Sequence, residues 1–357
     1  MPRPRPPRKY LVAAAGSVTA LAVAAGTAYA VAPNSDRVSG VQAGYDKAHP
    51  ASKPMKAAPA THVSPYVDTS LYPSFDLLGT AKKSGVKQFN LAFVLASGNS
   101  CTPKWGGNEA LTANKVAAQI SALRKAGGDV RVSFGGANGT ELALACKDAG
   151  SLAAAYGKVV NAFKLTKVDF DIEGGAQANT AANRRRGQAI ASLQKKHAGL
   201  KVSLTLPVLP SGLTRDGVNV LSSTTKGGAK IDAVNIMAMD YGDGVAPKPK
   251  GRMGGYAIAA ATATQKQVKA ALKLDDASAW RHVAVTPMIG VNDVATETFT
   301  LADARKLAAF AKAKHLAWTS LWSAARDKPC PGGPKPTADP TCSGISQAPS
   351  AFAKALN

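Results

Sequence analysis

Three acidic residues at alternate positions are the part of this sequence best suited to chemistry. Asp169, Asp171 and Glu173 lie in the stretch KVDFDIE and are separated by Phe170 and Ile172. Successive side chains of a β-strand point to opposite faces, so the three acids would share one face of a strand. Carboxyl groups held this close raise one another's pKa, which keeps at least one of them protonated near neutral pH. The pattern favours a group that donates a proton.

Two other interpretations of the acidic stretch are weighed against this one. Alternating acids also occur on the solvated face of an edge strand, but the apolar neighbours Leu165 and Val168 and the turn at Gly174-Gly175 favour a packed strand. Carboxylates also bind Mg²⁺ or Ca²⁺, yet the stretch lacks the spacing of a calcium-binding loop and has no His nearby. We therefore expect no metal and no cofactor.

The rest of the chain supplies elements that could position these acids. Eight apolar, strand-like runs alternate with helical segments, which is typical of a parallel sheet closed into a (β/α)₈ TIM barrel of class α/β. A doubly wound open sheet is the alternative, but no G-x-G-x-x-G follows an early strand. The expected strands are His62–Asp68, Phe89–Leu95, Asp129–Phe134, Lys167–Glu173, Lys201–Pro207, Ile231–Asp240, His282–Ile289 and Ala317–Ser323. The expected helices are Thr112–Lys125, Leu152–Phe163, Thr180–His197, Thr264–Leu274 and Leu301–Lys314.

Polar and unusual residues gather where the expected strands end. Active sites of such barrels lie at the carboxyl ends of the strands, so these residues should meet there. They are Ser133, Gly135 and Gly136 at the end of the third strand, Asp171 and Glu173 in the fourth, Met237, Met239, Asp240 and Tyr241 at the end of the sixth, and Trp322 in the eighth.

These strand ends resemble the motifs of family 18 glycoside hydrolases, the chitinases. The stretch Thr166–Glu173 is similar to the signature D-x-x-D-x-D-x-E, with Thr166 in place of its first Asp. Ser133–Gly136 resembles the S-x-G-G motif, Met237–Asp240 resembles M-x-Y-D with Met239 at the Tyr position, and Trp322 resembles the Trp that ends the last strand. The four motifs occur in the family's order across the region from about residue 61 onward.

The resemblance implies a retaining, substrate-assisted hydrolysis of β-1,4 bonds between N-acetylglucosamine units. Glu173 would be the general acid and base, and Asp171 would orient the N-acetyl group whose oxygen attacks the anomeric carbon. Asp169 would share a proton with Asp171. The small residues of S-x-G-G would leave space beside the acid. Tyr241 is expected to bind the acetamido carbonyl, with a group elsewhere in the chain as the alternative.

Aromatic residues are candidates for a sugar platform. By the resemblance, Trp322 floors the sugar subsite, whereas its alternative role is core packing. Trp105, on an expected loop after the second strand, is a second candidate platform. Trp280 and Trp318 lie in helix or strand patterns and are expected to be structural.

The beginning of the chain has the pattern of a secretory signal. A basic start, an Ala/Val/Leu-rich run and the small-x-small site ending at Ala30 predict a signal peptide over residues 1–30, with an uncleaved membrane anchor as the alternative. Residues 31–61 are rich in Pro, Ala and Lys and predict a flexible linker. Residues 62–357 are expected to form one catalytic domain.

The four cysteines fit an exported protein. An even number of Cys suggests two disulfides, for which three pairings exist. We favour Cys101–Cys146, which would tie the loops after the second and third strands, and Cys330–Cys342, which would close a short Pro/Gly-rich loop.

The formal net charge is +22, and removal of the four basic residues in the first 30 leaves +18. Such a surface attracts anionic polymers, so non-specific association with an anionic cell wall is a candidate property. Arg184-Arg185-Arg186 has no interleaved aromatics, and we expect no nucleic-acid partner. The expected partner is chitin or its oligomers, bound by a monomer. Rival functions are action on peptidoglycan or on the chitobiose core of N-glycans, and a chitin-binding lectin without turnover.

Overall fold

The computed structural model describes residues 62–357, and the predicted signal peptide and linker lie outside the described residues. Eight parallel strands follow one another in the order β1-β2-β4-β5-β6-β8-β9-β12. The first and last strands also meet, because Ser64 N–H donates to the Thr319 carbonyl and Tyr66 N–H to the Leu321 carbonyl, at 2.8 and 3.0 Å. The sheet therefore closes on itself, and the expected α/β barrel is confirmed.

Each of the eight expected runs overlaps a barrel strand; β2, β4 and β6 are longer than expected, and the other five strands are shorter. The barrel strands are β1 Tyr66–Asp68, β2 Gln88–Ser97, β4 Asp129–Gly135, β5 Lys167–Asp171, β6 Lys201–Leu209, β8 Ala233–Met237, β9 Val283–Thr286 and β12 Trp318–Thr319. Additional short strands in β-hairpins are β3 Ser100–Trp105, β7 Gly212–Leu213, β10 Gly290–Val291 and β11 Thr298–Phe299. The sequence did not indicate these hairpins.

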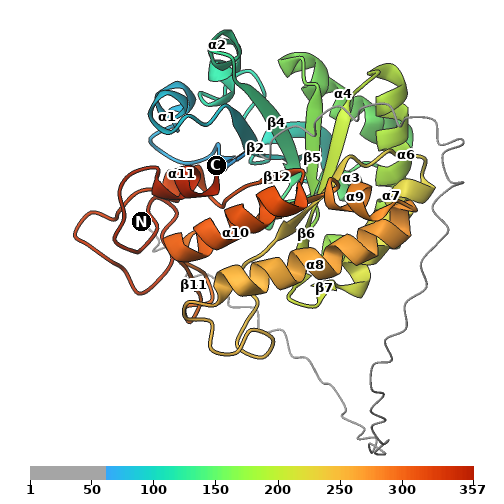
Figure 1. The fold of residues 1–357 in the computed structure, drawn as a ribbon. Helices are drawn as coiled ribbons and strands as arrows, with labels where there is room; N and C mark the ends of the chain where they lie inside the picture. The colour runs from blue at the N-terminus through green and yellow to red at the C-terminus, as the bar shows by residue number, and fades with distance from the viewer. Residues whose placement is uncertain (1–61) are drawn as a thin grey trace, which may run out of the picture. The chain divides into compact units, whose positions relative to one another are not determined.

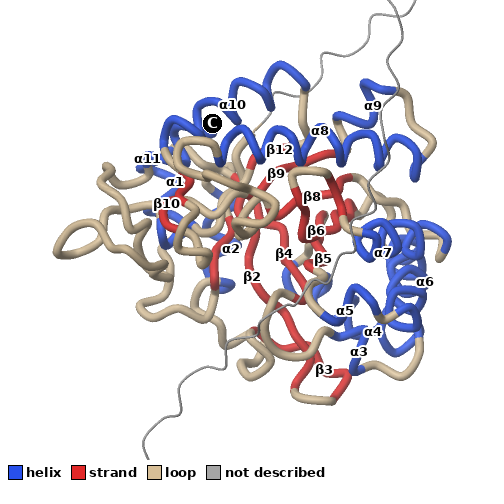
Figure 2. Tube along the Cα trace, turned by 90° about the horizontal axis from the view of Figure 1, so that it is seen from below, coloured by secondary structure: helices blue, strands red, loops and turns tan. Residues whose placement is uncertain are grey.

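Helices lie on the outside of the strands over much of the barrel (Figure 2). The long helices are α4 Ala149–Phe163, α6 Thr180–Lys196, α7 Arg215–Lys226, α8 Met253–Leu272 and α10 Leu301–Lys314. The shorter helical segments are α1 Leu77–Ser84, η1 Ala117–Gln119, α2 Ile120–Lys125, α3 Leu142–Ala145, α5 Gly175–Ala178, α9 Asp276–Trp280, η2 Ala324–Arg326 and α11 Ala351–Leu356. Within residues 62–357, no helix has the length and apolar character needed to cross a membrane.

Side-chain caps explain where several helices begin. Asp148 accepts a hydrogen bond from Ser151 N–H at 2.8 Å, so α4 starts at Ala149, three residues before the expected position. Thr300 caps α10 in the same way, and this helix has the expected bounds. The segment expected as a helix from Thr112 is irregular up to η1, because the side-chain oxygen Oδ1 of Asn114 accepts hydrogen bonds from the N–H groups of Val116 and Ala117.

Both expected disulfides are present, between Cys101 and Cys146 and between Cys330 and Cys342. The first joins β3 to the end of α3, and the second closes a loop near the C-terminus. Trp105 differs from expectation. It lies in β3, is 1% exposed and packs against Phe163, so it is part of the core and not a sugar platform.

Candidate active site

A cavity of about 430 Å³ opens among the carboxyl ends of the barrel strands, a size typical of ligand pockets. Its walls come from segments that are far apart in the sequence, from Tyr66 in β1 to Trp322 after β12. Of the expected site residues, six line this cavity: Asp171, Glu173, Met237, Met239, Asp240 and Trp322. Asp169, Ser133, Gly135, Gly136 and Tyr241 are not among the lining residues.

Asp169 lies fully buried in β5 and is held by hydroxyl groups. Its two carboxylate oxygens accept hydrogen bonds from Tyr66 at 2.9 Å, Ser133 at 2.7 Å, Ser203 at 2.5 Å and Thr205 at 2.9 Å. These donors come from β1, β4 and β6. The carboxylate therefore connects β5 to its two neighbours, β4 and β6, and to the first barrel strand, β1. Hydrogen bonds of this number satisfy a buried charge that would otherwise be costly. Asp169 therefore fixes the wall beneath the cavity.

Asp171 is the last residue of β5, and Glu173 lies just beyond the strand. Gly174 follows with φ of 50°, and α5 begins at Gly175, so the strand ends two residues earlier than expected. The carboxyl groups of Asp171 and Glu173 are hydrogen-bonded to each other. Oδ1 of Asp171 is buried, and no N–H or hydroxyl group within residues 62–357 donates a hydrogen bond to it. A buried carboxyl oxygen without such a donor is satisfied by the proton of a neighbouring acid or by a donor from a ligand.

The pair formed by Asp171 and Glu173 retains a proton near neutral pH. Burial raises the pKa of Asp171 well above its usual range, and the charges of Glu173 and Asp169 add to this effect. Burial also raises the pKa of Glu173 to about 7, an effect that the hydrogen bond to Asp171 opposes and the charge of Asp240 reinforces. Two interacting carboxyl groups titrate as a unit, so one proton is shared by the pair.

This proton should make the stability of the protein depend on pH. The pKa of Glu173 is 4.5 when unperturbed and about 7 in the folded state. The folded state then binds more protons than the unfolded state between these values, so stability is highest at low pH and falls as the pH rises from 4.5 to 7. At 1.36 kcal/mol per pKa unit the loss reaches about 3 kcal/mol. The free energy of urea unfolding should fall more between about pH 5 and about pH 8 in wild type than in Glu173→Gln, where burial still raises the pKa of Asp171. Equal pH dependence in the two proteins would contradict this prediction.

Three aromatic rings form one side of the cavity. The rings of Phe93 and Trp322 are stacked, with centroids 5.7 Å apart, and the Tyr66 ring lies 6.1 Å from that of Trp322. All three residues line the cavity. An aromatic face of this kind is suited to the apolar face of a sugar ring. Phe93 was not identified from the sequence. It lies at an irregularity in the pairing of β2 with β4, between Ala92 and Val94, and such bulges re-aim side chains.

Gly135 and Gly136 are required by close approaches beside the acids. A Cβ atom on Gly135 would lie 2.0 Å from the Asp171 carbonyl oxygen, and one on Gly136 would lie 2.8 Å from the Phe93 ring. Both have positive φ values, 102° and 97°. These glycines thus allow β4 to approach the end of β5 and allow Phe93 to face the cavity.

Tyr241 does not line the cavity, in contrast to Met237, Met239 and Asp240 from the same segment. Its ring packs against Tyr256 at 6.2 Å, and its hydroxyl is buried without a partner among residues 62–357. Burial, together with the charge of Glu297, raises the pKa of this hydroxyl. Glu297 accepts hydrogen bonds from Tyr241 and Gly242 N–H and so holds the turn after β8. The sequence had no motif that pointed to Glu297.

Asp240 lines the cavity next to Met239. Its Oδ1 accepts a hydrogen bond from Val294 N–H at 2.9 Å, which joins the segments after β8 and β10. Burial raises the pKa of its carboxyl, an effect that this hydrogen bond opposes. Among residues 62–357, no group of three His, Cys, Asp or Glu side chains is arranged to hold a metal ion.

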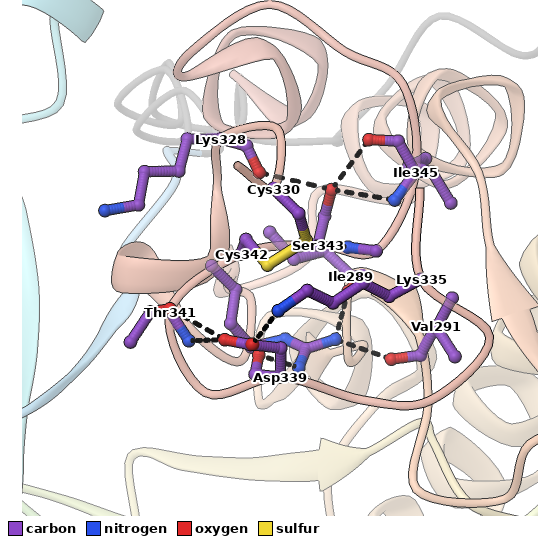
Figure 3. Close-up of a disulfide and its surroundings, with 12 residues drawn as sticks. Ile289, Val291, Lys328, Cys330, Lys335, Asp339, Thr341, Cys342, Ser343 and Ile345 are labelled. Atoms are coloured by element: carbon purple, nitrogen blue, oxygen red, sulfur yellow. Dashed lines mark hydrogen bonds and ion pairs between the residues drawn. A yellow bond between two sulfur atoms is a disulfide. The ribbon is translucent and has the colours of Figure 1, made fainter. Parts of the chain in front are cut away.

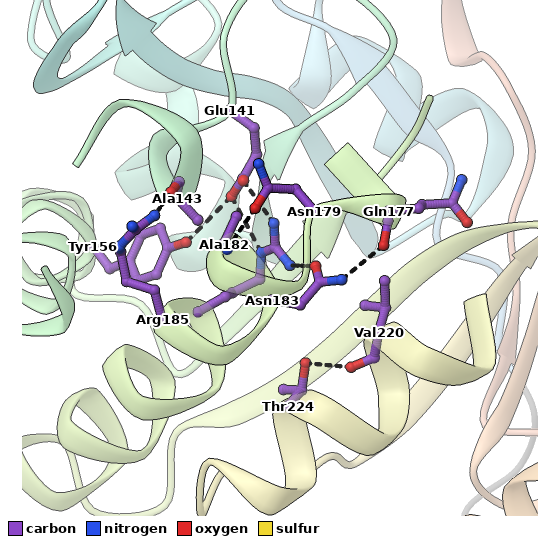
Figure 4. Close-up of polar contacts among 11 residues, drawn as sticks. Glu141, Ala143, Tyr156, Gln177, Asn179, Ala182, Asn183, Arg185, Val220 and Thr224 are labelled. Carbon is purple, nitrogen blue, oxygen red and sulfur yellow. Dashed lines mark hydrogen bonds and ion pairs between the residues drawn. The ribbon is translucent and has the colours of Figure 1, made fainter. Parts of the chain in front are cut away.

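A buried ion pair joins the start of α3 to α6 (Figure 4). Glu141 accepts from Arg186 at 2.7 Å, and Tyr156 donates to the same carboxylate at 3.4 Å. Arg186 is fully buried, and Arg185 donates to the Ala143 carbonyl at 2.5 Å. Two of the three consecutive arginines are therefore engaged in contacts within the fold.

The loop closed by Cys330 and Cys342 holds part of the cavity wall (Figure 3). Ser343, next to the disulfide, accepts from Val291 N–H at 2.8 Å, and Arg326 donates to the carbonyls of Ile289 and Val291 at 2.9 and 2.5 Å. A Cβ atom on Gly290 would lie 1.9 Å from the Ser343 carbonyl oxygen, so the two segments are in direct contact. This contact fixes the chain between Met288 and Asp293, both of which line the cavity.

Removal of this disulfide should cost stability. The two cysteines are 12 residues apart, and a loop of about this length contributes about 3 kcal/mol by restricting the unfolded chain. We expect the double variant Cys330→Ser/Cys342→Ser to lose about 2–4 kcal/mol of unfolding free energy in urea, without reductant. Added reductant should lower the unfolding free energy of wild type, so the difference in unfolding free energy between wild type and the double variant should become smaller. An unchanged unfolding midpoint in the variant would refute the prediction.

Comparisons with known proteins agree with this site. No family model matches the chain. The chain is 38% identical over 286 residues to a probable bifunctional chitinase/lysozyme of Escherichia coli strain K12. The matched region covers 77% of this chain and 32% of that protein. It is 38% identical over 287 residues to endochitinase 11 of Metarhizium anisopliae, covering 77% of this chain and 54% of that protein. The chain thus spans between a third and about half of the length of these relatives.

A solved structure decides the family. The catalytic domain of a hyperthermophilic chitinase from Pyrococcus furiosus superposes with a TM-score of 0.75 at 32% identity, over 84% of this chain and 94% of that one. The chain belongs to glycoside hydrolase family 18, the chitinase family. Family membership agrees with the order of motifs along the chain, with the barrel, and with the position of Asp171 and Glu173 at the end of β5.

Proposed function

We propose that this family 18 protein is a chitinase that hydrolyses β-1,4 bonds between N-acetylglucosamine units. The observation that carries the proposal is the pair of Asp171 and Glu173, which holds a proton at the wall of a cavity with an aromatic face. A protonated carboxyl group beside a bound sugar is what protonation of a glycosidic oxygen requires. A mutant of the Pyrococcus furiosus domain has been described in complex with chito-oligosaccharides, which supports this substrate class.

In the proposed mechanism the substrate supplies the nucleophile. The 2-acetamido oxygen attacks the anomeric carbon, the bond to the leaving oxygen breaks, and Glu173 donates its proton to that oxygen. Asp171, whose buried Oδ1 accepts no hydrogen bond from an N–H or hydroxyl group of residues 62–357, accepts the acetamido N–H and stabilises the positive charge that develops on the ring formed. Water then opens this ring as Glu173 recovers the proton, and the configuration at the anomeric carbon is retained.

Asp169 acts through its neighbours in this proposal. Its oxygens are occupied by four hydroxyl groups, and Glu173 is the carboxyl group to which Asp171 is hydrogen-bonded. Its negative charge raises the pKa of Asp171 and so helps to keep the proton within the pair. Trp322 supplies the platform for the sugar. The role of Tyr241 as donor to the acetamido carbonyl requires its hydroxyl to turn toward the cavity on binding.

Cleavage of an N-acetylglucosamine hexamer tests the proposal. Wild type should release shorter oligomers, with the β anomer as the first product by proton NMR because the mechanism retains configuration. Release of the α anomer would refute the substrate-assisted mechanism. Binding of the hexamer without cleavage would support the lectin, and neither binding nor cleavage would remove chitin as the substrate.

Action on peptidoglycan is the second candidate, because one relative is named a probable bifunctional chitinase/lysozyme. The key group would still be an N-acetyl group beside the broken bond. The chitobiose core of N-glycans meets the same requirement. Solubilisation of purified cell walls, compared with hexamer cleavage, would separate these substrates.

We further propose that the protein is exported as a monomer by the predicted signal peptide of residues 1–30 and that it contacts anionic cell-wall polymers through its basic surface. The net charge and the Ala30 cleavage pattern support this proposal. Nucleic acid is not a proposed partner, since the Arg184–Arg186 run is partly engaged within the fold. Detection of a mature chain that begins at residue 31 in the culture medium would support export.

A further inference from the structure

A second cavity, of about 410 Å³, lies between helices α6 and α7, which pack side by side on the outside of the barrel (Figures 1 and 2). We call this cavity the α6–α7 groove. Its polar lining side chains are Thr180, Arg184 and Gln188 of α6 and Ser223 and Lys226 of α7. It shares no lining residue with the cavity at the strand ends, so the proposed hydrolysis gives it no role.

Two glycines bring the helices together beside the groove. A Cβ atom on Gly187 would lie 2.8 Å from the Thr224 carbonyl oxygen, and one on Gly227 would lie 2.6 Å from the Gly187 carbonyl carbon. The three polar residues that α6 contributes are spaced by four, so they share one face of that helix. Because backbone contacts fix the distance between the helices, the groove is a permanent part of the fold.

Both cations of the groove are available to a ligand. Arg184 and Lys226 are exposed, and neither side chain forms an ion pair or hydrogen bond within residues 62–357. The two arginines that follow Arg184 differ, since Arg185 donates to a main-chain carbonyl and Arg186 pairs with Glu141. Arg184 is therefore the member of the arginine run that remains for a partner outside the fold.

The hydroxyl group of Ser223 differs from those of its neighbours in the same way. The hydroxyls of Ser222, Thr224 and Thr225 each donate to a carbonyl about one turn earlier in α7, as Figure 4 shows for Thr224. Ser223 makes no such hydrogen bond among the described residues, and it lines the groove. Together with Thr180 and Gln188, it adds two hydroxyls and an amide that can donate to a ligand.

No opposing charge lies in the groove. Among residues 62–357, no carboxyl group is part of its lining. Helix α6 has no Asp or Glu, and the acid of α7, Asp216, is at the opposite end of that helix from Lys226. A hollow lined by one sign of charge concentrates ligands of the other sign, so the groove favours an anion.

Phosphate is the anionic group that suits these donors best. The guanidinium of Arg184 can donate two parallel hydrogen bonds to a phosphate, and the ammonium and hydroxyl groups can reach its other oxygens, whereas a carboxylate has only two oxygens. No aromatic ring lines the groove in the described part of the chain, so it lacks a surface on which nucleic-acid bases could stack. Its volume is that of an ordinary ligand pocket and exceeds the volume of one phosphate group.

We propose that the α6–α7 groove binds phosphate groups of a phosphodiester-linked polymer that has no bases. This inference rests on the proposed contact with anionic cell-wall polymers and gives that contact a site, but it does not depend on the proposed hydrolysis. Because the groove and the strand-end cavity are lined by different residues, a protein held at the groove can still admit a sugar chain to the cavity.

Titration calorimetry with a synthetic poly(glycerol phosphate) tests this proposal. Arg184→Gln/Lys226→Gln should bind the polymer about three- to thirtyfold more weakly than wild type, because two partly solvated charge contacts are lost. The slope of log Kd against log salt should fall by about 1.4, at about 0.7 for each phosphate contact of a single strand. Ser223→Ala leaves the charge unchanged and should weaken binding about two- to tenfold.

A matched control separates the groove from the general basic surface. Arg305→Gln/Lys306→Gln removes the same two residue types from exposed positions of α10 and should bind the polymer as wild type does. An equal loss of affinity in both double variants would overturn the inference and leave the proposed contact with the basic surface intact. Failure of wild type to bind the polymer would overturn both proposals.

Other anions identify the ligand class. Inorganic phosphate should bind more weakly than the polymer, which can contact the groove through several groups. Equal affinity for inorganic phosphate would indicate a site for a small anion, and equal affinity for polyglutamate or for an oligothymidylate would indicate carboxylates or nucleic acid; each result would overturn the inference. Arg184→Gln/Lys226→Gln should cleave the N-acetylglucosamine hexamer at the wild-type rate. If wild type binds the polymer at the groove but cleaves no hexamer, the proposed hydrolysis is wrong and this inference stands.

Discussion

We expect Glu173→Gln to lower kcat for the N-acetylglucosamine hexamer by about 10²- to 10⁴-fold, the usual contribution of a positioned general acid and base. Gln has nearly the shape of Glu and can hydrogen-bond to Asp171, but it has no acidic proton for the leaving oxygen. The cavity wall should therefore keep its form, and KM should change little. Product release measured by chromatography gives kcat, and titration calorimetry of the inactive variant gives the affinity for the hexamer.

A matched variant separates this effect from a general loss of carboxylates. Glu109→Gln changes the same residue type at a position outside the cavity lining, where the carboxylate accepts from Asn114 and Gln can do the same. It should keep wild-type kcat. If Glu173→Gln kept more than about a tenth of wild-type kcat, another group would have to be the acid, since this loss is smaller than general acid catalysis supplies.

The barrel was predictable because its strands are apolar in sequence and alternate with helices. Local packing explains the errors. The helix α8 begins at Met253, eleven residues before the expected start, in a run rich in Gly and Ala. A Cβ atom on Gly254 would lie 2.9 Å from the Asp303 Cα atom, so small residues are needed where α8 meets α10. A sequence pattern gives information on helix propensity and on periodicity, whereas the close approach of α8 and α10 depends on tertiary packing.

The part of the site that belongs to β5 was predictable from residue types and alternation. Asp171 and Glu173 line the cavity, and Trp322 joins them from the other end of the chain. Phe93 and Asp293 were not predictable, because their exposure to the cavity depends on distant contacts. The ring of Phe93 stacks on Trp322, and the segment before Asp293 is held by the loop that contains Cys330. Neither contact has a signature in the local sequence.

The pairing of Asp171 with Glu173 also connects function with stability. Burial of both carboxyl groups raises the pKa of Glu173 to about 7, which leaves a proton available for donation in neutral solution. The same burial makes the folded state less stable as the pH rises, since the unfolded chain can ionise freely. Active sites commonly retain groups that stabilise the folded state poorly. The burial that keeps this proton on the pair therefore lowers the free energy of unfolding at neutral pH relative to low pH.

Asp171→Ala is the second variant with a large expected effect. In the proposed mechanism the Asp171 carboxylate accepts the acetamido N–H and stabilises the developing positive charge, and loss of one such preorganised group costs about 10²- to 10³-fold in kcat. A purely structural role would also lower activity, so the rate alone is not decisive. The pH profile provides the additional measurement.

The direction of the pH shift follows from the hydrogen bond between the two acids. In the wild-type protein the hydrogen bond to Asp171 lowers the pKa of Glu173, against the raising effect of burial. Removal of Asp171 takes away this opposing contribution while burial remains, so the pKa of Glu173 should rise. The general acid must be protonated, and activity falls as the pH rises through its pKa. The alkaline limb of kcat should therefore move to higher pH in Asp171→Ala, while Asp216→Asn keeps the wild-type limb. An alkaline limb that stays in place or moves to lower pH would show that Asp171 does not tune the proton of Glu173.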